Sequence, residues 1–308
     1  MSKLWQQKSA ERLKGGHDWL PLILLLLGLT THFAYLSIAP PGVHGDSARL
    51  GLHAFDFLQK GIWPFYIYHQ FAPNPLIVYL QAWAFAIFGF TPSALSGVTA
   101  FGGALAVPAI YLACRELFAD EGKQFSRRAG FVAAVGLGLC PFFGNYSRYG
   151  IEGALLVAIE LLAVASLWRG FRRRHWYDYC LCGVLVGLSQ YTYIVGRVFP
   201  VALAAACIAA FLASRPLLAR WRGLVLAACS AAIVALPQWL LFIQAPYTLV
   251  ARTQGNLQPF VLGLPNAGSV LGAKLLSQLR MLGWQWSTGY HPHSNRPLLT
   301  PVLFAGLW

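Results

Sequence analysis

The sequence has 308 residues, of which 57% are hydrophobic and 11% are charged, with a formal net charge of +13. This composition excludes a soluble globular protein, because too few polar side chains remain to cover a water-facing surface. The basic residues fall in short connections between apolar runs, which is the positive-inside pattern of membrane proteins and not a nucleic-acid-binding surface. The six cysteines lie in or beside the apolar runs and indicate neither a disulfide framework nor a zinc site.

The N-terminal part predicts a membrane anchor that is not cleaved. Residues 1–19 carry four basic side chains, and we expect them in the cytoplasm. The apolar run that follows predicts a first span over Leu20–Ala39, which Pro40, Pro41 and Gly42 end.

Residues 40–92 are predicted to form the first extracytoplasmic loop. A helix in it would carry a narrow polar stripe, because five polar residues are spaced three, four, three and four apart: Asp46, Arg49, His53, Asp56 and Lys60. We interpret it as an interface helix that turns this stripe into a protein cavity and ends at Gly61. The alternative is a surface helix with Asp46 as its N-cap. His44 and His53 are interpreted as local hydrogen-bond partners and not as metal ligands.

The run Leu76–Phe90 is short for a span, and the alternation of loops requires it to begin and end outside. We therefore expect a re-entrant or interface helix there. The remaining spans are predicted at Ser93–Cys114, Ala129–Gly144, Ile151–Trp168, Tyr179–Tyr193, Val198–Ala213 and Gly223–Ile243. The loops 115–128, 169–175 and 215–222 are rich in arginine and indicate the cytoplasmic side, so the tips 145–150 and 191–197 should emerge outside.

The last part of the chain predicts an outer loop, 244–297, with an amphipathic helix at Ser269–Leu282. Residues 298–308 begin an apolar run that is too short to span, which indicates the start of a truncated transmembrane helix. Residues 20–243 would thus form the transmembrane core. The sequence predicts an all-α, polytopic integral membrane protein with about seven to eight spans and interface helices in the first outer loop.

The ten acidic residues divide by side. Six lie near the predicted inner side, where we expect solvated partners for basic residues: Glu11, Asp18, Glu116, Asp120, Glu121 and Asp178. The outer side keeps Asp46, Asp56 and Glu152. Glu152 follows Arg148 by four residues, so the two are predicted to share a helix face, either as a local ion pair or as functional groups. For Glu160, in the middle of a span, a hydrogen bond to another helix is the favoured reading.

The two outer tips and the first loop would place carboxylates and arginines at the depth of a lipid phosphate. A carboxylate can accept a proton from an acceptor hydroxyl, and a fixed arginine can stabilise charge on a departing phosphate. Arg197, beside Tyr191 and Tyr193, is predicted to be either a snorkelling anchor or the site of an anionic group.

The order of motifs resembles the polyprenyl-phosphate-sugar-dependent membrane glycosyltransferases of the GT-C type, which include the protein O-mannosyltransferases and the lipid A aminoarabinose transferase. The resemblance rests on these segments: Gly45-Asp46 with Ala48-Arg49, Asn74-Pro75-Leu76 with Tyr79, Val107–Phe118, Asn145–Leu156 and Gly187–Pro200.

The resemblance implies that Asp46 is the catalytic base and Glu152 a second catalytic acid that binds acceptor or metal. Ser47 stands where the family usually has Glu, and the stretch Ala72–Pro75 lacks the family's basic residue, so Arg197 or Arg49 would bind the phosphate. The complete set of substrate-binding candidates is Arg49, Arg148, Arg197, Tyr191, Tyr193, His53 and Asn74.

The resulting hypothesis is a glycosyltransferase of the bacterial plasma membrane. It would move a sugar, with inversion, from a polyprenyl-phosphate donor to a protein, lipid or glycan acceptor outside the cytoplasm. No cofactor is assigned, a divalent metal is left open, and no nucleic-acid partner is expected. The alternatives are a transporter or flippase for a lipid-linked or anionic solute that uses Glu152 and Glu160, and a non-catalytic scaffold.

Overall fold

The computed structural model describes residues 18–38, 42–63, 74–213 and 221–246, together with six residues between 268 and 276. Within these residues all regular structure is helical, which confirms the predicted all-α class. The elements are α2 (Leu20–Phe33), α3 (Gly45–Lys60), α4 (Pro75–Phe88), α5 (Pro92–Leu117), η2 (Ala119–Glu121), α6 (Lys123–Gly138), α7 (Pro141–Ser147), α8 (Gly153–Arg173), α9 (Trp176–Ser189), η3 (Ile194–Arg197), α10 (Phe199–Ala213) and α11 (Trp221–Gln244).

Helices stand at each of the seven predicted spans up to residue 243. Three of them, α5, α8 and α11, are long and apolar enough to cross a membrane on their own, and a fourth span results if α6 and α7 are counted together across their 61° bend. The first span is shorter than predicted, because α2 ends at Phe33 and turns continue to Ile38. The described residues inside the predicted helix Ser269–Leu282 are helical, while the segment 298–308 lies outside the described residues.

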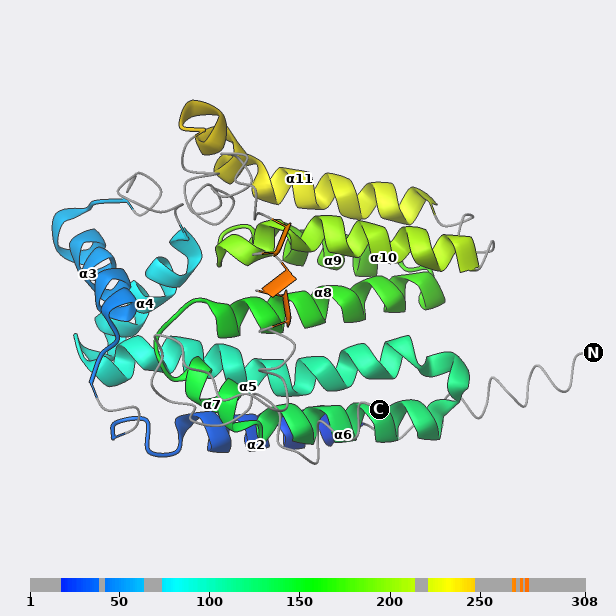
Figure 1. Cartoon of the computed structure of the whole chain (residues 1–308), viewed down its shortest axis with the longest axis horizontal. Helices are drawn as coiled ribbons and strands as arrows, with labels where there is room; N and C mark the ends of the chain where they lie inside the picture. The colour runs from blue at the N-terminus through cyan, green and yellow to red at the C-terminus, as the bar shows by residue number, and fades with distance from the viewer. Residues whose placement is uncertain are drawn as a thin grey trace, which may run out of the picture.

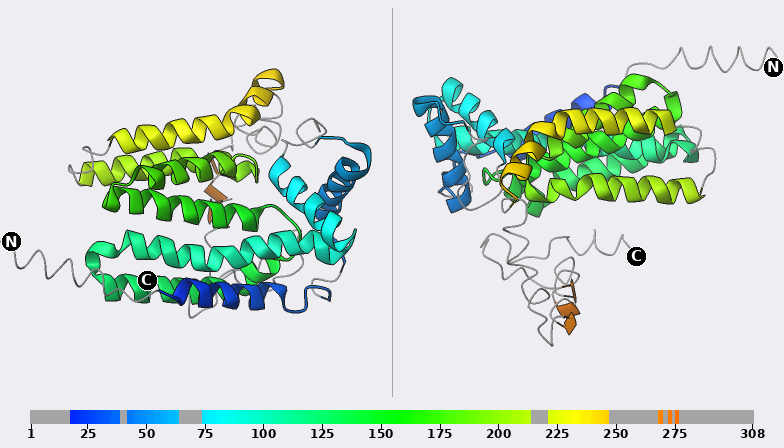
Figure 2. Two further views of the ribbon diagram at one scale, coloured as in Figure 1. Left: turned by 180° about the vertical axis from the view of Figure 1, so that it is seen from behind. Right: turned by 90° about the horizontal axis from the view of Figure 1, so that it is seen from above.

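The connections between helices separate to the two ends of the bundle (Figures 1 and 2). One end carries α3, α4, the α7–α8 turn and the α9–α10 turn. The opposite end carries the α5–α6 and α8–α9 connections and the start of α11. This arrangement agrees with the predicted alternation of arginine-rich loops and outer tips. The orientation relative to the cytoplasm stays a prediction.

The two helices of the first outer loop lie side by side at the end of the bundle, inclined to its long helices (Figure 1). They are joined by an apolar cluster that includes Leu50 and Ala54 of α3 and Ile77 and Ala82 of α4, all of them buried. α4 has 14 residues and a proline at its start, and this length suits the predicted interface or re-entrant helix better than a full span.

The centre of the bundle is α5, which packs against α2, α6 and α8; α8 packs in turn against α9, and α9 against α11. Small residues allow these close contacts. At Gly102 of α5 an added Cβ would lie 2.8 Å from the Cα of Leu155 in α8, so only a glycine allows the two backbones to approach this closely.

Three acidic side chains at the arginine-rich end, Asp18, Glu116 and Asp178, form ion pairs with arginines. Asp18 accepts from Arg115 at 3.1 Å and from Arg127 at 3.0 Å. Glu116 accepts from Arg172 at 2.5 Å, and it is 3% exposed. The prediction of solvated acids is therefore wrong for Glu116 and also for Asp178, which is fully buried against Arg169. Buried carboxylates without such partners would be strongly destabilising.

We expect Gly102→Ala to lower stability by about 1–3 kcal/mol, because the new methyl group meets the backbone of α8 and forces the two helices apart. The matched control is Gly144→Ala in α7, where an added Cβ meets no atom within 4 Å. Thermal unfolding of the purified protein in detergent measures both variants. Equal midpoints for the two would contradict the proposed close contact.

Candidate active site

The polar stripe of α3 forms as predicted, with its cap assigned differently. His44 precedes the helix, and its Nδ1 accepts a hydrogen bond from the Asp46 amide at 3.2 Å, so His44 and not Asp46 is the N-cap. Gly61 ends the helix in the left-handed conformation with φ 66°. The Asp46 carboxylate lies 4.0 Å from Arg49, and its side chain is 58% exposed. Asp46 is thus free to meet a ligand.

The second candidate acid lies directly before α8. Glu152 is 4% exposed, and Asn74, which precedes α4, donates its Nδ2 to Glu152 Oε1 at 2.8 Å. Two residues of the predicted set, 78 positions apart, are thereby in direct contact. Sequence spacing offered no sign of this hydrogen bond.

The prediction that Arg148 and Glu152 share a helix face is wrong. α7 ends at Ser147, and Gly150 adopts φ +74°, so the chain turns between α7 and α8 instead of continuing as one helix. Arg148 donates to the carbonyl of Ala34 after α2, and the described residues show no ion pair between Arg148 and Glu152. Arg148 therefore anchors the turn to the end of α2.

Three buried side chains that the sequence analysis did not select hold this turn. Ser47 of α3 donates to the carbonyl of Tyr149. Gln81 of α4 donates to the carbonyl of Gly150 at 3.2 Å, and Thr99 of α5 accepts from the Gly150 amide at 3.1 Å. Each of the three side chains is 0% exposed. In the sequence, Gln81 and Thr99 are polar residues inside apolar runs, whereas Ser47 lies among polar residues and has no such signal.

The second outer tip, residues 191–197 between α9 and α10, lies against the start of α4. The amide of Leu76 donates to the carbonyl of Tyr191 at 3.1 Å, next to the Asn74–Glu152 contact. The Tyr191 hydroxyl donates to the carbonyl of Val234 in α11 at 2.5 Å. Tyr193 is half-buried in an extended conformation before η3. The first loop, the α7–α8 turn and this tip therefore meet at one end of the bundle.

Arg197 at the end of η3 has an unusual environment. Its guanidinium stacks over the ring of Phe242 at 4.5 Å, and its three nitrogens are shielded from water without a hydrogen-bond partner among the described residues. Burial lowers the pKa of Arg197 from 12.5 to about 10, so the side chain still carries its charge at neutral pH. A charge in this position strongly favours an anionic ligand.

Burial and neighbouring charges shift the pKa of Glu152. Burial raises the pKa of Glu152 above its usual 4.5. Hydrogen bonds and the positive charge of Arg49 act in the opposite direction, whereas the negative charge of Asp46 adds to the rise. Asp46 and Arg49 of α3 therefore lie close enough to Glu152 for their charges to affect its pKa.

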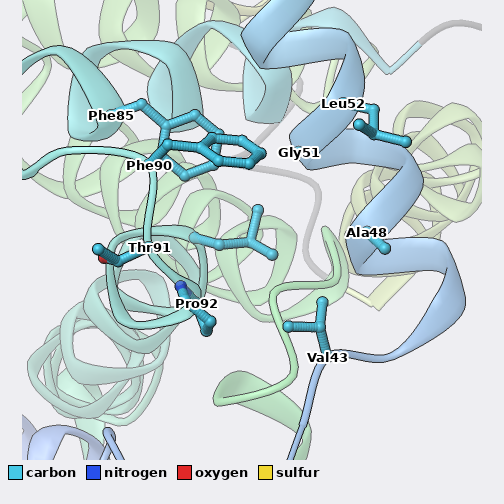
Figure 3. A pocket seen from close by; sticks show the side chains of 9 residues that line it. Val43, Ala48, Gly51, Leu52, Phe85, Phe90, Thr91 and Pro92 are labelled. Carbon is cyan, nitrogen blue, oxygen red and sulfur yellow. The ribbon is translucent and has the colours of Figure 1, made fainter.

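An apolar cavity of about 280 Å³ lies beside α3 (Figure 3). Ala48 and Leu52 of α3 line one side of it, and Phe85 and Phe90 the other. Ala48 follows Asp46 by two residues, which places the two roughly 200° apart around the helix. The cavity therefore lies on the opposite side of α3 from the Asp46 carboxylate.

No group of three His, Cys, Asp or Glu side chains gathers within the described ranges to hold a metal ion. Among the described residues, Glu160 forms no hydrogen bond or ion pair. The expected hydrogen bond from Glu160 to a neighbouring helix is therefore not seen among these residues. His53 lies in α3 on the same stripe as Asp46.

Comparison with known proteins agrees with this architecture. The chain resembles the crystal structure of an oligosaccharyltransferase from Archaeoglobus fulgidus, which was determined with an acceptor peptide tethered by a disulfide bond. The TM-score is 0.56 and the identity 19%, over 86% of this chain and 38% of that protein, so the likeness shows a shared fold and the chain spans well under half of the larger protein. A search of curated protein sequences gives no match.

A family model for dolichyl-phosphate-mannose-protein mannosyltransferases matches residues 72–241. The matched region contains Asn74, Glu152 and Arg197, and it begins after α3. Because the match covers more than half of the sequence, the chain belongs to the dolichyl-phosphate-mannose-protein mannosyltransferase family.

Proposed function

We propose that this chain transfers a sugar from a polyprenyl-phosphate-linked donor to an acceptor on the extracytoplasmic side of a bacterial plasma membrane, with its N-terminus in the cytoplasm. The observation that carries the proposal is the contact between the first outer loop and the α7–α8 turn. Ser47, next to Asp46, donates to the carbonyl of Tyr149, and Asn74 donates to Glu152 at 2.8 Å. The family description, which names dolichyl-phosphate mannose, supports a lipid-phosphate donor.

Asp46 is the proposed general base. Its exposed carboxylate would take the proton from an acceptor hydroxyl, and the hydroxyl oxygen would attack the anomeric carbon of the sugar. The bond between that carbon and the phosphate oxygen breaks in the same displacement, so the configuration inverts. The proton ends on Asp46, and the phosphate leaves with the bonding electron pair.

Arg197 is the proposed partner of the departing phosphate. Its guanidinium is charged, shielded from solvent and without a hydrogen-bond partner among the described residues. An incoming phosphate would therefore gain charge-assisted hydrogen bonds without displacing an existing partner. Arg49 already lies 4.0 Å from Asp46, and its proposed role is to orient that carboxylate.

Glu152 and Asn74 are the proposed binding pair for a sugar or acceptor hydroxyl. Asn74 Oδ1 is buried and has no hydrogen-bond partner within the described part of the chain, and it could therefore accept from a ligand hydroxyl. Tyr193 and His53 remain proposed contacts with substrate. Tyr191 and Arg148 instead hold the two tips through their hydrogen bonds to Val234 and Ala34.

A divalent metal has no assigned step in this mechanism, because the described side chains do not form a ligand set. The transporter hypothesis used Glu152 and Glu160 as charged sites embedded in the membrane. Glu152 instead lies at the end of the bundle, bonded to Asn74, which favours the transferase.

We expect Asp46→Asn to lower the rate of sugar transfer by about 10²–10⁴-fold, because the amide cannot accept the acceptor proton. The matched control is Asp56→Asn on the same polar stripe of α3, where the carboxylate forms a half-exposed ion pair with Lys60 at 2.8 Å. Transfer from radiolabelled dolichyl-phosphate mannose, measured with both variants, tests the proposal. Full turnover by a folded Asp46→Asn protein would exclude Asp46 from the reaction.

For Arg197→Met we expect opposite effects on stability and donor binding. Arg197 is a buried charge with no hydrogen-bond partner among the described residues, so its removal should stabilise the unliganded protein by about 1–3 kcal/mol. Loss of the phosphate contact should raise the KM for the donor by about 10–100-fold.

The control for this variant is Arg128→Met, an exposed side chain of α6 near the opposite end of the bundle. Thermal unfolding without donor and initial rates over a range of donor concentrations separate the two effects. A destabilised Arg197→Met protein with an unchanged KM would show that Arg197 has a structural partner instead.

A further inference from the structure

The turn that carries Glu152 is held from three sides. Its two central residues, Tyr149 and Gly150, exchange hydrogen bonds with Ser47 of α3, Gln81 of α4 and Thr99 of α5. These helices come from different parts of the chain, and all three side chains are fully buried. The backbone groups of a buried turn need such partners, because water cannot reach them.

The turn is also pressed closely against α3. A Cβ on Gly150 would lie 3.3 Å from the Cβ of Ser47 and 3.4 Å from Leu95, and the positive φ of Gly150 would strain any other residue. On the same face, the His44 ring meets the Tyr149 ring edge-on, with centroids 6.2 Å apart. Helix α3 and the turn are therefore joined at adjacent positions.

These contacts lie next to both candidate acids in the sequence. Ser47 directly follows Asp46, and Gly150 precedes Glu152 by two residues. The hydrogen bond from Ser47 to the carbonyl of Tyr149 therefore connects the backbone segments that carry the two acids. Buried hydrogen bonds fix one position of the turn relative to α3, whereas apolar contacts alone would allow the two to shift against each other.

We propose that Ser47, Gln81 and Thr99 are positioning residues, which hold the backbone of Tyr149 and Gly150 and thereby set the place of Glu152 relative to Asp46. This inference rests on the proposed function of the two acids. Helix α3 and the α7–α8 turn then act as one unit. None of the three side chains needs to touch the substrate for this role.

Two readouts test the proposal. The first is hydrogen exchange of the peptide that covers residues 148–152, which does not depend on activity. In Ser47→Ala and in Thr99→Val we expect exchange there to become about fivefold faster, because each variant removes one hydrogen bond to the turn. Thr99→Val provides a second test if Ser47→Ala fails to fold. Thr99→Ser, which retains the hydroxyl and adds no volume, should keep the protection.

The second readout is the acid limb of kcat/KM for transfer from dolichyl-phosphate mannose. Burial holds the pKa of Glu152 above 4.5, with Arg49, Asp46 and Asn74 as the groups that face it. Asp46, as the proposed base, also contributes to this limb. A loosened turn admits water to Glu152, so the pKa of Glu152 falls and the part of the acid limb that reports Glu152 moves to lower pH. A variant that merely lowers the folded fraction would reduce the rate without moving the limb.

The matched control is Ser166→Ala, a buried serine of α8 away from the turn, for which we expect neither effect. Unchanged exchange at 148–152 in both Ser47→Ala and Thr99→Val would overturn the proposal. Faster exchange with an unmoved acid limb would also overturn it, because the contacts would then be structural only. Failure of the proposed function is distinguishable, since Asp46→Asn would keep its turnover whatever the exchange shows.

Discussion

The hydrogen bonds to the turn at Tyr149 and Gly150 are the constraint on which the site depends. They connect the first outer loop to the centre of the bundle, because Ser47 lies in α3 and Thr99 in α5. Without them, α3 would be attached to the bundle mainly by the apolar cluster it shares with α4. Apolar contacts hold the helices together without direction, whereas the buried hydrogen bonds select a single position of α3 relative to the bundle.

Charged side chains have different partners at the two ends of the bundle. At the arginine-rich end, buried acids such as Glu116 and Asp178 are neutralised by arginines at 2.5 Å. At the other end, Asp46 is exposed, Glu152 is bonded to a neutral amide, and Arg197 faces an aromatic ring. Paired charges stabilise a fold, whereas charges left without a partner favour binding of a charged ligand. This contrast supports the proposed site at the end of the bundle that carries α3.

The family match begins at residue 72 and leaves α3 outside it. The position where the resemblance expects a glutamate holds Ser47, and the structure gives a physical reason for a small residue there. Ser47 is fully buried and lies against Gly150, so a longer, charged side chain would be desolvated and would push the turn away. The small side chain of Ser47 therefore allows α3 to lie directly against the turn.

The sequence by itself determined the all-α class, the position of each long apolar helix, the division of loops between two ends and the polar stripe of α3. These features depend on composition and on the period of 3.6 residues, which are local properties. The tertiary structure alone decided that Gly150 separates Arg148 from Glu152, that Asn74 bonds Glu152 across 78 positions, and that His44 caps α3. It also decided which buried polar residues hold the turn, because the partners of such groups come from other helices and no periodicity records them.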